Sequence, residues 1–266
     1  MPEFIKVSYP RERVVELKLS SPDKENRING QMVKELIDTL RELEDDTSIR
    51  VMVLTGEGDI FCGGADVDWI KNAQEHPTMP HLDPGSRIVD ALHELDTFPR
   101  PVIAKINGDA FGGGVGLMAC SDIAIAAESC QMGFQEITFG MVPLAAAVFA
   151  SNAIGLNQSN RWLLTGEVMT AEKALEIGLV HEAVADDQLD EEVNRQIDLL
   201  LKGGPRAQRE TKQLLRQLSE RDKYQTPGYR TTFGHVFQRC LSSNEGKRGI
   251  DAVLNNEPAP WSVKKD

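Results

Sequence analysis

Two glycine-rich corners and one glutamate carry the residue types that could do chemistry in this chain. The segment 101–118, PVIAKINGDAFGGGVGLM, has the pattern of a strand, an Asn-Gly turn and three consecutive glycines that open a helix. Glycine lets the backbone approach a ligand closely, and the first turn of a helix leaves N–H groups unpaired at the positive end of the helix dipole. We therefore expect an anion or oxyanion site here. A lone glycine-rich turn is, about as often, a tight turn that needs glycine for steric reasons alone.

The spacing of these glycines excludes two common phosphate-binding motifs. A dinucleotide-binding fingerprint requires G-x-G-x-x-G directly after a strand. After Gly112 and Gly114, Leu117 stands where the third glycine belongs, and the chain has no GxxxxGK[ST] sequence. The corner is therefore neither a Rossmann fingerprint nor a P-loop.

The second corner lies in the segment 60–69, IFCGGADVDW, just after the predicted strand VMVLT. Gly63, Gly64 and Ala65 form a run of small residues before a predicted helix, and Asp66 can cap that helix through its side chain. Two such corners can place two N–H donors on one oxygen. Because removal of one such donor typically costs ~3 kcal/mol in the transition state, a converging pair would be catalytically valuable.

The elements around these corners predict an α/β fold. Helical spacing runs from 31 to 43, with Asn29 and Gly30 in front of it as a capping pair. Short runs rich in β-branched residues predict strands at 14–19, 51–55, 101–106, 122–126 and 180–184. Alternation of strands and helices is typical of an α/β protein.

The last third of the chain is predicted to be helical, with no strand after about residue 187. Gly203 and Gly204 end one predicted helix and Pro205 begins the next, which sets a boundary near residue 200. We therefore divide the chain into a core, 1–200, and a C-terminal helical region, 201–266. That region is either a continuation of the core or an oligomer contact.

Bulk composition limits the partners. The net charge of −12 and pI near 5.0 disfavour nucleic acid and anionic membrane surfaces, although a local cluster can still bind a small anion. The four cysteines have no metal-ligand spacing, and no apolar segment approaches the length of a membrane span. We expect a cytoplasmic protein without a metal site.

Four ordered sequence blocks together resemble the crotonase (enoyl-CoA hydratase/isomerase) family over roughly residues 10–250: FCGGAD, INGDAFGGGVGL, MGFQEITFGMVP and LLTGEVMTAEKALEIGLV. The resemblance implies a crotonase-like spiral of repeated ββα units followed by a C-terminal helical trimerisation region. It also implies an acyl-CoA thioester substrate, no cofactor apart from the coenzyme A that the substrate carries, and a homotrimer or dimer of trimers.

The resemblance also implies the site residues. The two oxyanion donors would be the N–H groups of Ala65 and Gly113, and Glu136 in GFQEITFG would be a catalytic carboxylate. A carboxylate inside an apolar acyl pocket has its pKa raised toward neutrality, which suits proton transfer. The residues implied in substrate binding are Lys24, Asn26, Arg27, Gly63, Gly64, Asp66, Val67, Gly112, Pro143 and Leu144.

One departure from the family affects the predicted reaction. The second family glutamate would stand at position 116, where this chain has Gly116. Hydration is commonly served by two carboxylates that hold one water, whereas a double-bond shift can use a single base, so one glutamate favours isomerisation. Hydration stays open, because relatives such as hydroxycinnamoyl-CoA hydratase-lyases also lack this glutamate. Candidates for a second acid are Asp68, Tyr229 and His235, the last expected to lie in a helical packing face.

Three alternatives therefore remain after the sequence. The first is an enoyl-CoA isomerase or hydratase. The second is a hydratase-lyase or thioester hydrolase acting on a bulkier acyl-CoA. Where the family often has Pro-Gly, Pro143 is here followed by Leu144, Ala145, Ala146 and Ala147, which suggests an unusual acyl group. The third is a non-catalytic binding or scaffold protein that keeps the fold.

Overall fold

The computed structural model describes residues 3–76, 83–219 and 227–261, without the side chains of 218 and 227–233. Two sheets form its centre. The larger sheet has the order β1 (Ile5–Arg11), β2 (Val14–Leu19), β3 (Val51–Gly56), β5 (Val102–Ile106), β7 (Ile123–Ala127) and β10 (Glu182–Val184). The smaller sheet has the order β4 (Ile60–Cys62), β6 (Asp109–Phe111), β8 (Gln131–Gly133) and β9 (Val168–Thr170). Among the strands of the described residues, β1–β2 and β8–β9 pair antiparallel and the other neighbours pair parallel.

Successive units of the chain place one strand in each sheet and then add a helix. The units are β3–β4–α2, with α2 at Val67–Glu75, β5–β6–α4, with α4 at Gly113–Cys120, and β7–β8–α5, with α5 at Leu144–Thr165. The α/β class and the repeated ββα units are therefore confirmed. All five predicted strands are present, and the one predicted from residue 180 begins two residues later.

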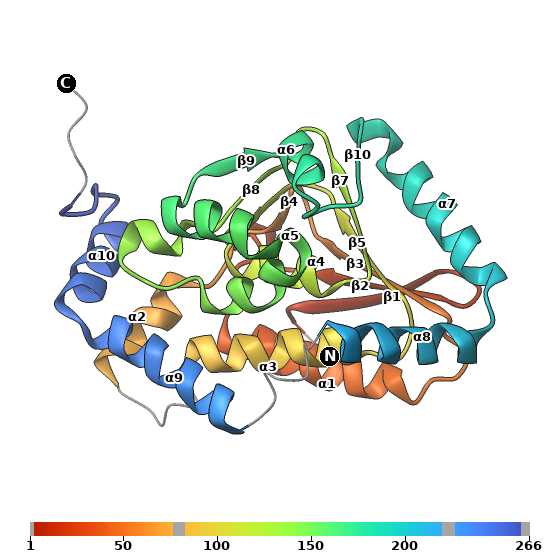
Figure 1. Ribbon diagram of the computed structural model, residues 1–266, viewed down its shortest axis with the longest axis horizontal. Helices are drawn as coiled ribbons and strands as arrows, with labels where there is room; N and C mark the ends of the chain where they lie inside the picture. Colours follow the sequence, from red (N-terminus) through yellow and green to blue (C-terminus); the bar gives the residue numbers. More distant parts are fainter. Residues whose placement is uncertain (1–2, 77–82, 220–226, 262–266) are drawn as a thin grey trace.

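Burial explains why the strand predictions succeeded. Every residue of β3 is buried, as expected for a central parallel strand covered on both faces. The predicted helix is α1 (Gly30–Glu44), and the side chain of Asn29 caps it by accepting from the N–H groups of Gln31 and Met32. Its apolar face packs beside α3 (Pro84–Thr97) under the larger sheet (Figure 1).

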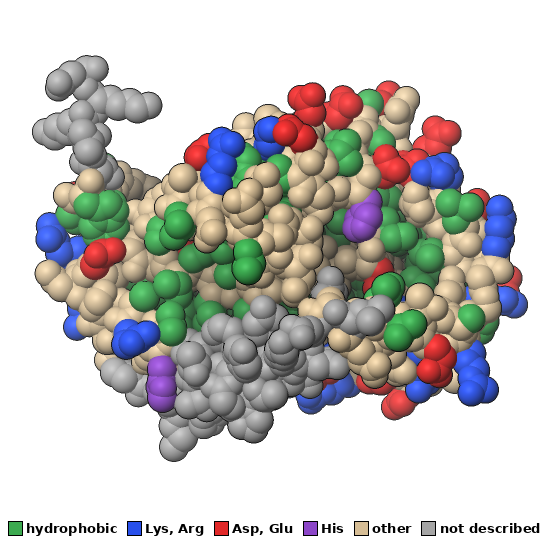
Figure 2. All heavy atoms as spheres, in the orientation of Figure 1, with side chains coloured by type: hydrophobic (Ala, Val, Ile, Leu, Met, Phe, Trp, Pro, Cys, Tyr) green, Lys and Arg blue, Asp and Glu red, His purple; other side chains and the backbone are tan. Residues whose placement is uncertain are grey.

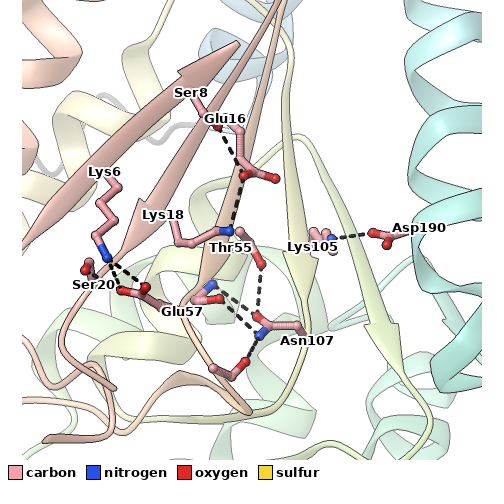
Figure 3. Close-up of polar contacts among 12 residues, drawn as sticks. Lys6, Ser8, Glu16, Lys18, Ser20, Thr55, Glu57, Lys105, Asn107 and Asp190 are labelled. Carbon is pink, nitrogen blue, oxygen red and sulfur yellow. Dashed lines mark hydrogen bonds and ion pairs between the residues drawn. The ribbon is translucent and has the colours of Figure 1, made fainter. Parts of the chain in front are cut away.

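Asn107 fixes the edge of the sheet at which the glycine-rich corners begin. Its Oδ1 accepts from Thr55 Oγ1 at 2.9 Å and from the Gly56 N–H at 3.0 Å. Its Nδ2 donates to the carbonyls of Gly56 and Gly58 at 3.1 and 2.8 Å (Figure 3). These bonds join the carboxyl ends of β3 and β5. Glycine is needed at the next position, since a Cβ on Gly108 would lie 2.0 Å from the Asp59 carbonyl oxygen.

The C-terminal helices are α7 (Leu189–Lys202), α8 (Pro205–Leu218), α9 (Pro227–Ser242) and α10 (Asn244–Leu254). As predicted, α7 ends before the Gly203-Gly204 pair and α8 begins at Pro205. In Figure 1, α9 lies along α3, and α10 lies against α2 and the 3-10 helix η3 (Gln135–Phe139). The separate domain boundary near residue 200 stays a prediction.

Short elements complete the described chain: η1 (Pro22–Lys24), α6 (Ala171–Glu176) and η4 (Asp186–Gln188). Acidic side chains gather along the edge that holds α6, β10 and the start of α7 (Figure 2). Asp190, Glu191 and Glu192 occupy the first turn of α7, where negative charge complements the helix dipole.

Candidate active site

The first corner directs a backbone N–H group away from its neighbouring segment. In the corner that follows β4, the Gly64 carbonyl accepts the N–H of Ile28 at 2.7 Å. The N–H of Asp66 donates to the Ile28 carbonyl at 2.9 Å. Because both bonds go to the residues flanking Ala65, the N–H of Ala65 points to the other side. Within the described residues, this N–H has no acceptor. Asp66 caps α2 by accepting from the Trp69 N–H at 2.9 Å, as predicted.

The second corner leaves the first N–H of α4 unpaired. Gly112 adopts φ 49° and ψ −114°, a conformation that suits glycine, and donates its N–H to the Gly133 carbonyl at 2.9 Å. The first bond of the helix runs from the Gly116 N–H to the Gly112 carbonyl at 3.1 Å. In the part of the chain that the structure describes, the N–H of Gly113 has no acceptor.

The two corners are in contact, and glycine is needed for this contact. A Cβ on Gly64 would lie 3.1 Å from the Phe111 carbonyl oxygen, and the φ of Gly64 is +92°. A Cβ on Gly114 would lie 2.5 Å from the Cys62 carbonyl oxygen. The two unpaired N–H groups therefore belong to adjoining backbone segments.

Glu136 brings a carboxylate to the same place. A Cβ on Gly112 would lie only 2.5 Å from Glu136 Oε1, so the carboxylate rests against the start of α4. Although the residue as a whole is only partly buried, its Oε2 atom is buried and has no hydrogen-bond partner among the described residues. Loss of hydration on burial raises the pKa of Glu136 to about 7, and a hydrogen bond with its own backbone has a smaller, opposing effect. The predicted rise in pKa is confirmed.

One cavity joins these groups. Its volume is about 30 Å³, and its lining is apolar apart from the carboxylate and the corner backbone. The lining residues are Ala65, Ile70, Pro84, Gly85, Ile88, Gly113, Glu136, Phe139, Met141, Val142, Leu144, Ala145 and Phe237. Two unpaired N–H donors and one neutral-range carboxylate beside an apolar cavity are suited to stabilising a developing oxyanion while moving a proton.

The structure places the other predicted substrate-binding residues around the first corner. Arg27 donates from Nη1 to the Gly63 carbonyl at 2.9 Å and pairs with Glu25, and Lys24 is exposed at the end of η1. Val67 begins α2. Asn26 is fully buried.

The side chain of Asn26 is occupied by backbone groups. Its Oδ1 accepts from the Ser21 N–H at 2.9 Å, and its Nδ2 donates to the carbonyls of Glu57 and Ile60 at 2.9 and 2.7 Å. Asn26 therefore acts here by holding the loop before Ile28. Of the predicted pocket pair, Leu144 lines the cavity, whereas Pro143 precedes α5 and does not.

Position 116 is packed against neighbouring helices, and a side chain there would require Leu92 to move. A Cβ on Gly116 would lie 2.7 Å from Leu92 Cδ1 and 3.6 Å from the Ala146 Cα. The position therefore belongs to the packing of α4 between α3 and α5, and Gly116 does not line the cavity.

The candidate second acids do not reach the cavity where the structure describes them. Asp68 is exposed in the first turn of α2. His235 is exposed on α9, so the expected place in a packing face is wrong. It lies two positions from the buried Phe237, and residues two apart lie on nearly opposite sides of a helix. The side chain of Tyr229 lies outside the described residues.

Sequence reasoning missed a buried carboxylate and the cavity wall. Asp83 is fully buried as the cap of α3, where it accepts from the Ser86 N–H and Oγ, both at 2.9 Å, and burial raises its pKa. The Asp83-Pro84 pair is a helix-start signal that could have identified the cap. No local pattern marks Phe237 or Met141 as cavity residues, because each joins the site through tertiary packing.

None of the described residues form a group of three or more His, Cys, Asp or Glu side chains arranged to hold a metal ion. None of the helices described is both long enough and apolar enough to cross a membrane.

Comparison with known proteins gives the family. The family model described as enoyl-CoA hydratase/isomerase matches residues 10–264. The chain is 30% identical over 211 residues to 2,3-dehydroadipyl-CoA hydratase of Escherichia coli K12, covering 79% of this chain and 81% of that protein. It is also 30% identical over 247 residues to hydroxycinnamoyl-CoA hydratase-lyase of Pseudomonas fluorescens, covering 90% and 88%.

A solved structure agrees over nearly the whole chain. The crystal structure of an enoyl-CoA hydratase from Mycobacterium avium matches with a TM-score of 0.84 and 26% identity, covering 98% of this chain and 100% of that one. The spiral of ββα units found above is therefore the crotonase fold. The chain belongs to the enoyl-CoA hydratase/isomerase family of enzymes.

Proposed function

We propose that this enzyme acts on an acyl-CoA thioester, with the N–H groups of Ala65 and Gly113 binding the thioester oxygen and Glu136 moving the proton. The observation that carries the proposal is the carboxylate of Glu136, which lines a cavity shared with Ala65 and Gly113 and whose buried Oε2 has no hydrogen-bond partner among the described residues. A carboxylate is not usually buried without a partner unless it has a functional role.

The chemistry follows from the acidity of a thioester. Protons on the carbon next to the carbonyl are weakly acidic, so their removal is slow unless the enolate oxygen is hydrogen-bonded as its charge grows. The two backbone N–H donors need not reorient as the charge develops, because the start of α4 fixes Gly113 and the β-bridge to Ile28 fixes Ala65. Removal of one such donor typically costs ~3 kcal/mol of transition-state stabilisation.

A shift of the double bond is the reaction that one carboxylate can complete. Glu136 removes a proton from C2 of a 3-enoyl thioester, and the electron pair moves into an enolate held by the two N–H groups. The same carboxyl group then returns the proton to C4, which yields the 2-enoyl thioester and restores the base. The glycine at position 116, which supplies no second carboxylate, supports this choice over hydration by two glutamates.

A second candidate is a hydratase-lyase reaction on a bulkier acyl-CoA. It is supported by the 30% identity to a protein named hydroxycinnamoyl-CoA hydratase-lyase. Under either reaction, we place the coenzyme A moiety at the first corner, where Lys24 and Arg27 supply positive charge beside Gly63. Assembly as a homotrimer or dimer of trimers and a cytoplasmic location stay predictions.

The test is turnover of a panel of 2-enoyl, 3-enoyl and aromatic acyl-CoA thioesters, with products identified by mass spectrometry. We expect 3-enoyl thioesters to give 2-enoyl products without a change in mass. A shortened acyl chain would instead indicate lyase chemistry, a gain of water would indicate hydration, and a free thiol would indicate hydrolysis.

Two variants assign the base. Glu136→Gln is expected to lower turnover by ~100-fold or more, because general acid–base catalysis typically contributes that much. Asp68→Asn is the matched control, since Asp68 is an exposed carboxylate outside the cavity. Full activity in Glu136→Gln would reject the assignment, and failure of every thioester to bind in calorimetry would favour a non-catalytic scaffold.

A further inference from the structure

A residue from the far end of the chain closes the cavity that Glu136 lines. Phe237 lies on α9, is 6% exposed and forms part of the cavity wall. Its ring rests on the start of α3, where a Cβ on Gly85 would lie 2.6 Å from Phe237 Cδ2 and 2.8 Å from Cγ. Any side chain at 85 would displace the ring, so the two residues form one closed contact.

The position of this contact along α3 gives the depth of the cavity. Ile88 also lines the cavity, and its Cγ2 would lie 3.7 Å from a Cβ on Gly113. Gly85 and Ile88 are three residues apart, which is about 4.5 Å along a helix axis. Phe237 and Gly113 therefore contact α3 at points about one helical turn apart.

Phe237 is held in place by a second apolar cluster, separate from the main core. The cluster joins α2, α9, α10 and the segment that follows Glu136: Ile70, Ala73, Met141, Leu144, Phe237, Leu241 and Ile250. Side chains in such a cluster are close-packed and resist displacement. The whole cavity that the ring helps to line, about 30 Å³, holds on the order of one or two water molecules.

We propose that Phe237 sets the length of the acyl chain that this enzyme accepts, by ending the acyl cavity about one helical turn from the thioester oxygen. This inference rests on the proposed function, because it takes an acyl-CoA thioester as the ligand. It makes short, unbranched acyl groups the preferred substrates. It also makes the C-terminal helix α9 part of the specificity of a site whose reacting groups all lie in the ββα core.

The test measures binding of two unreactive thioesters, butyryl-CoA and decanoyl-CoA, to the full-length protein by calorimetry. The readout is the ratio of their dissociation constants. Phe237→Ala and the milder Phe237→Leu are compared with the wild type, and Leu241→Ala is the matched control. Leu241 lies one turn further along the same face of α9, is in the same cluster, and does not line the cavity.

We expect the wild type to bind butyryl-CoA more tightly, and Phe237→Ala to shift the ratio toward decanoyl-CoA by roughly tenfold or more, the size of effect that one or two methylenes have in an apolar pocket. Phe237→Leu should shift it less and Leu241→Ala by no more than about twofold. An unchanged ratio in both Phe237 variants, or a wild type that prefers decanoyl-CoA, overturns the inference.

These outcomes separate the inference from the proposed function. Binding ratios do not depend on catalysis, so a Glu136→Gln enzyme that kept its turnover would refute the proposed base and leave the chain-length result standing. An unchanged ratio with both thioesters bound would refute only the role of Phe237. A wild type that bound neither thioester would overturn both.

Discussion

Glu136→Gln should make the protein more stable at neutral and alkaline pH while removing its activity. Burial raises the pKa of Glu136 to about 7 from an ordinary value of 4.5. At 1.36 kcal/mol per pKa unit, ionising this carboxyl in the folded protein costs about 3 kcal/mol more than in the unfolded chain. Glutamine has nearly the same shape and does not ionise, so the substitution removes this penalty.

The sign and the pH window follow from the two pKa values. Below 4.5 the carboxyl is neutral in both states, so wild type and variant should differ little. Between 4.5 and about 7 the folded wild type binds the proton more tightly than the unfolded chain, and its stability falls as pH rises. The advantage of Glu136→Gln should therefore be about 1 kcal/mol near pH 5 and about 3 kcal/mol above pH 7.

The assay is urea unfolding of both proteins at several pH values and one protein concentration, since assembly makes apparent stability depend on concentration. Asp68→Asn, which alters an exposed carboxylate, should show no comparable rise. A stability difference that stays constant from pH 5 to pH 8, or a variant less stable than wild type at high pH, would refute the idea that this carboxylate is buried at an energetic cost.

Three further predictions test the same region. The kcat/KM of the wild type should rise through about pH 7 as the Glu136 carboxyl ionises and then level off, and a profile with no break near neutrality contradicts its role as the base. Gly112→Ala should lower kcat by ~100-fold or more while the protein still folds, because the new Cβ would lie 2.5 Å from Glu136 Oε1 and displace the carboxylate. Steady-state kinetics on the folded variant test this, and an unchanged kcat contradicts it. Gly249→Ala should lower the free energy of unfolding by ~1–3 kcal/mol, because its Cβ would lie 2.1 Å from the Phe139 carbonyl oxygen and push α10 away from η3. An unchanged melting temperature contradicts that packing.

The sequence predicted those features that depend on local pattern. The fully buried β3 reads as an uninterrupted apolar run, and the Asn29 cap of α1 is a short-range signal. The two glycine-rich corners were found because close backbone approach leaves few choices other than glycine. Their residues do lie in contact, with Ala65 and Gly113 in one cavity.

Features that depend on distant partners could not be predicted. Nothing near Gly116 indicates that Leu92, 24 positions earlier, fills the space beside it. The same holds for Phe237, which reaches the cavity only because α9 packs along α3. His235 was misplaced for a simpler reason, since it was grouped with Phe237 although two positions along a helix turn a side chain to the opposite face.

Asn26 shows how a residue matched by resemblance can have a structural role. It was predicted to contact the substrate, but its side chain is used by three backbone groups. The left-handed conformation of Glu25 and Asn26, with φ of 55° and 51°, creates the turn that these bonds hold. Such a turn keeps Ile28 in register with the first corner and so positions the N–H of Ala65 indirectly.

The most direct test of the account is a crystal structure with a bound saturated acyl-CoA. We expect the thioester oxygen to lie about 2.7–3.1 Å from the amide nitrogens of both Ala65 and Gly113, with the adjacent carbon within about 3.5 Å of a Glu136 carboxylate oxygen. A thioester oxygen bound away from these two nitrogens, with Glu136 facing another group, would contradict the mechanism.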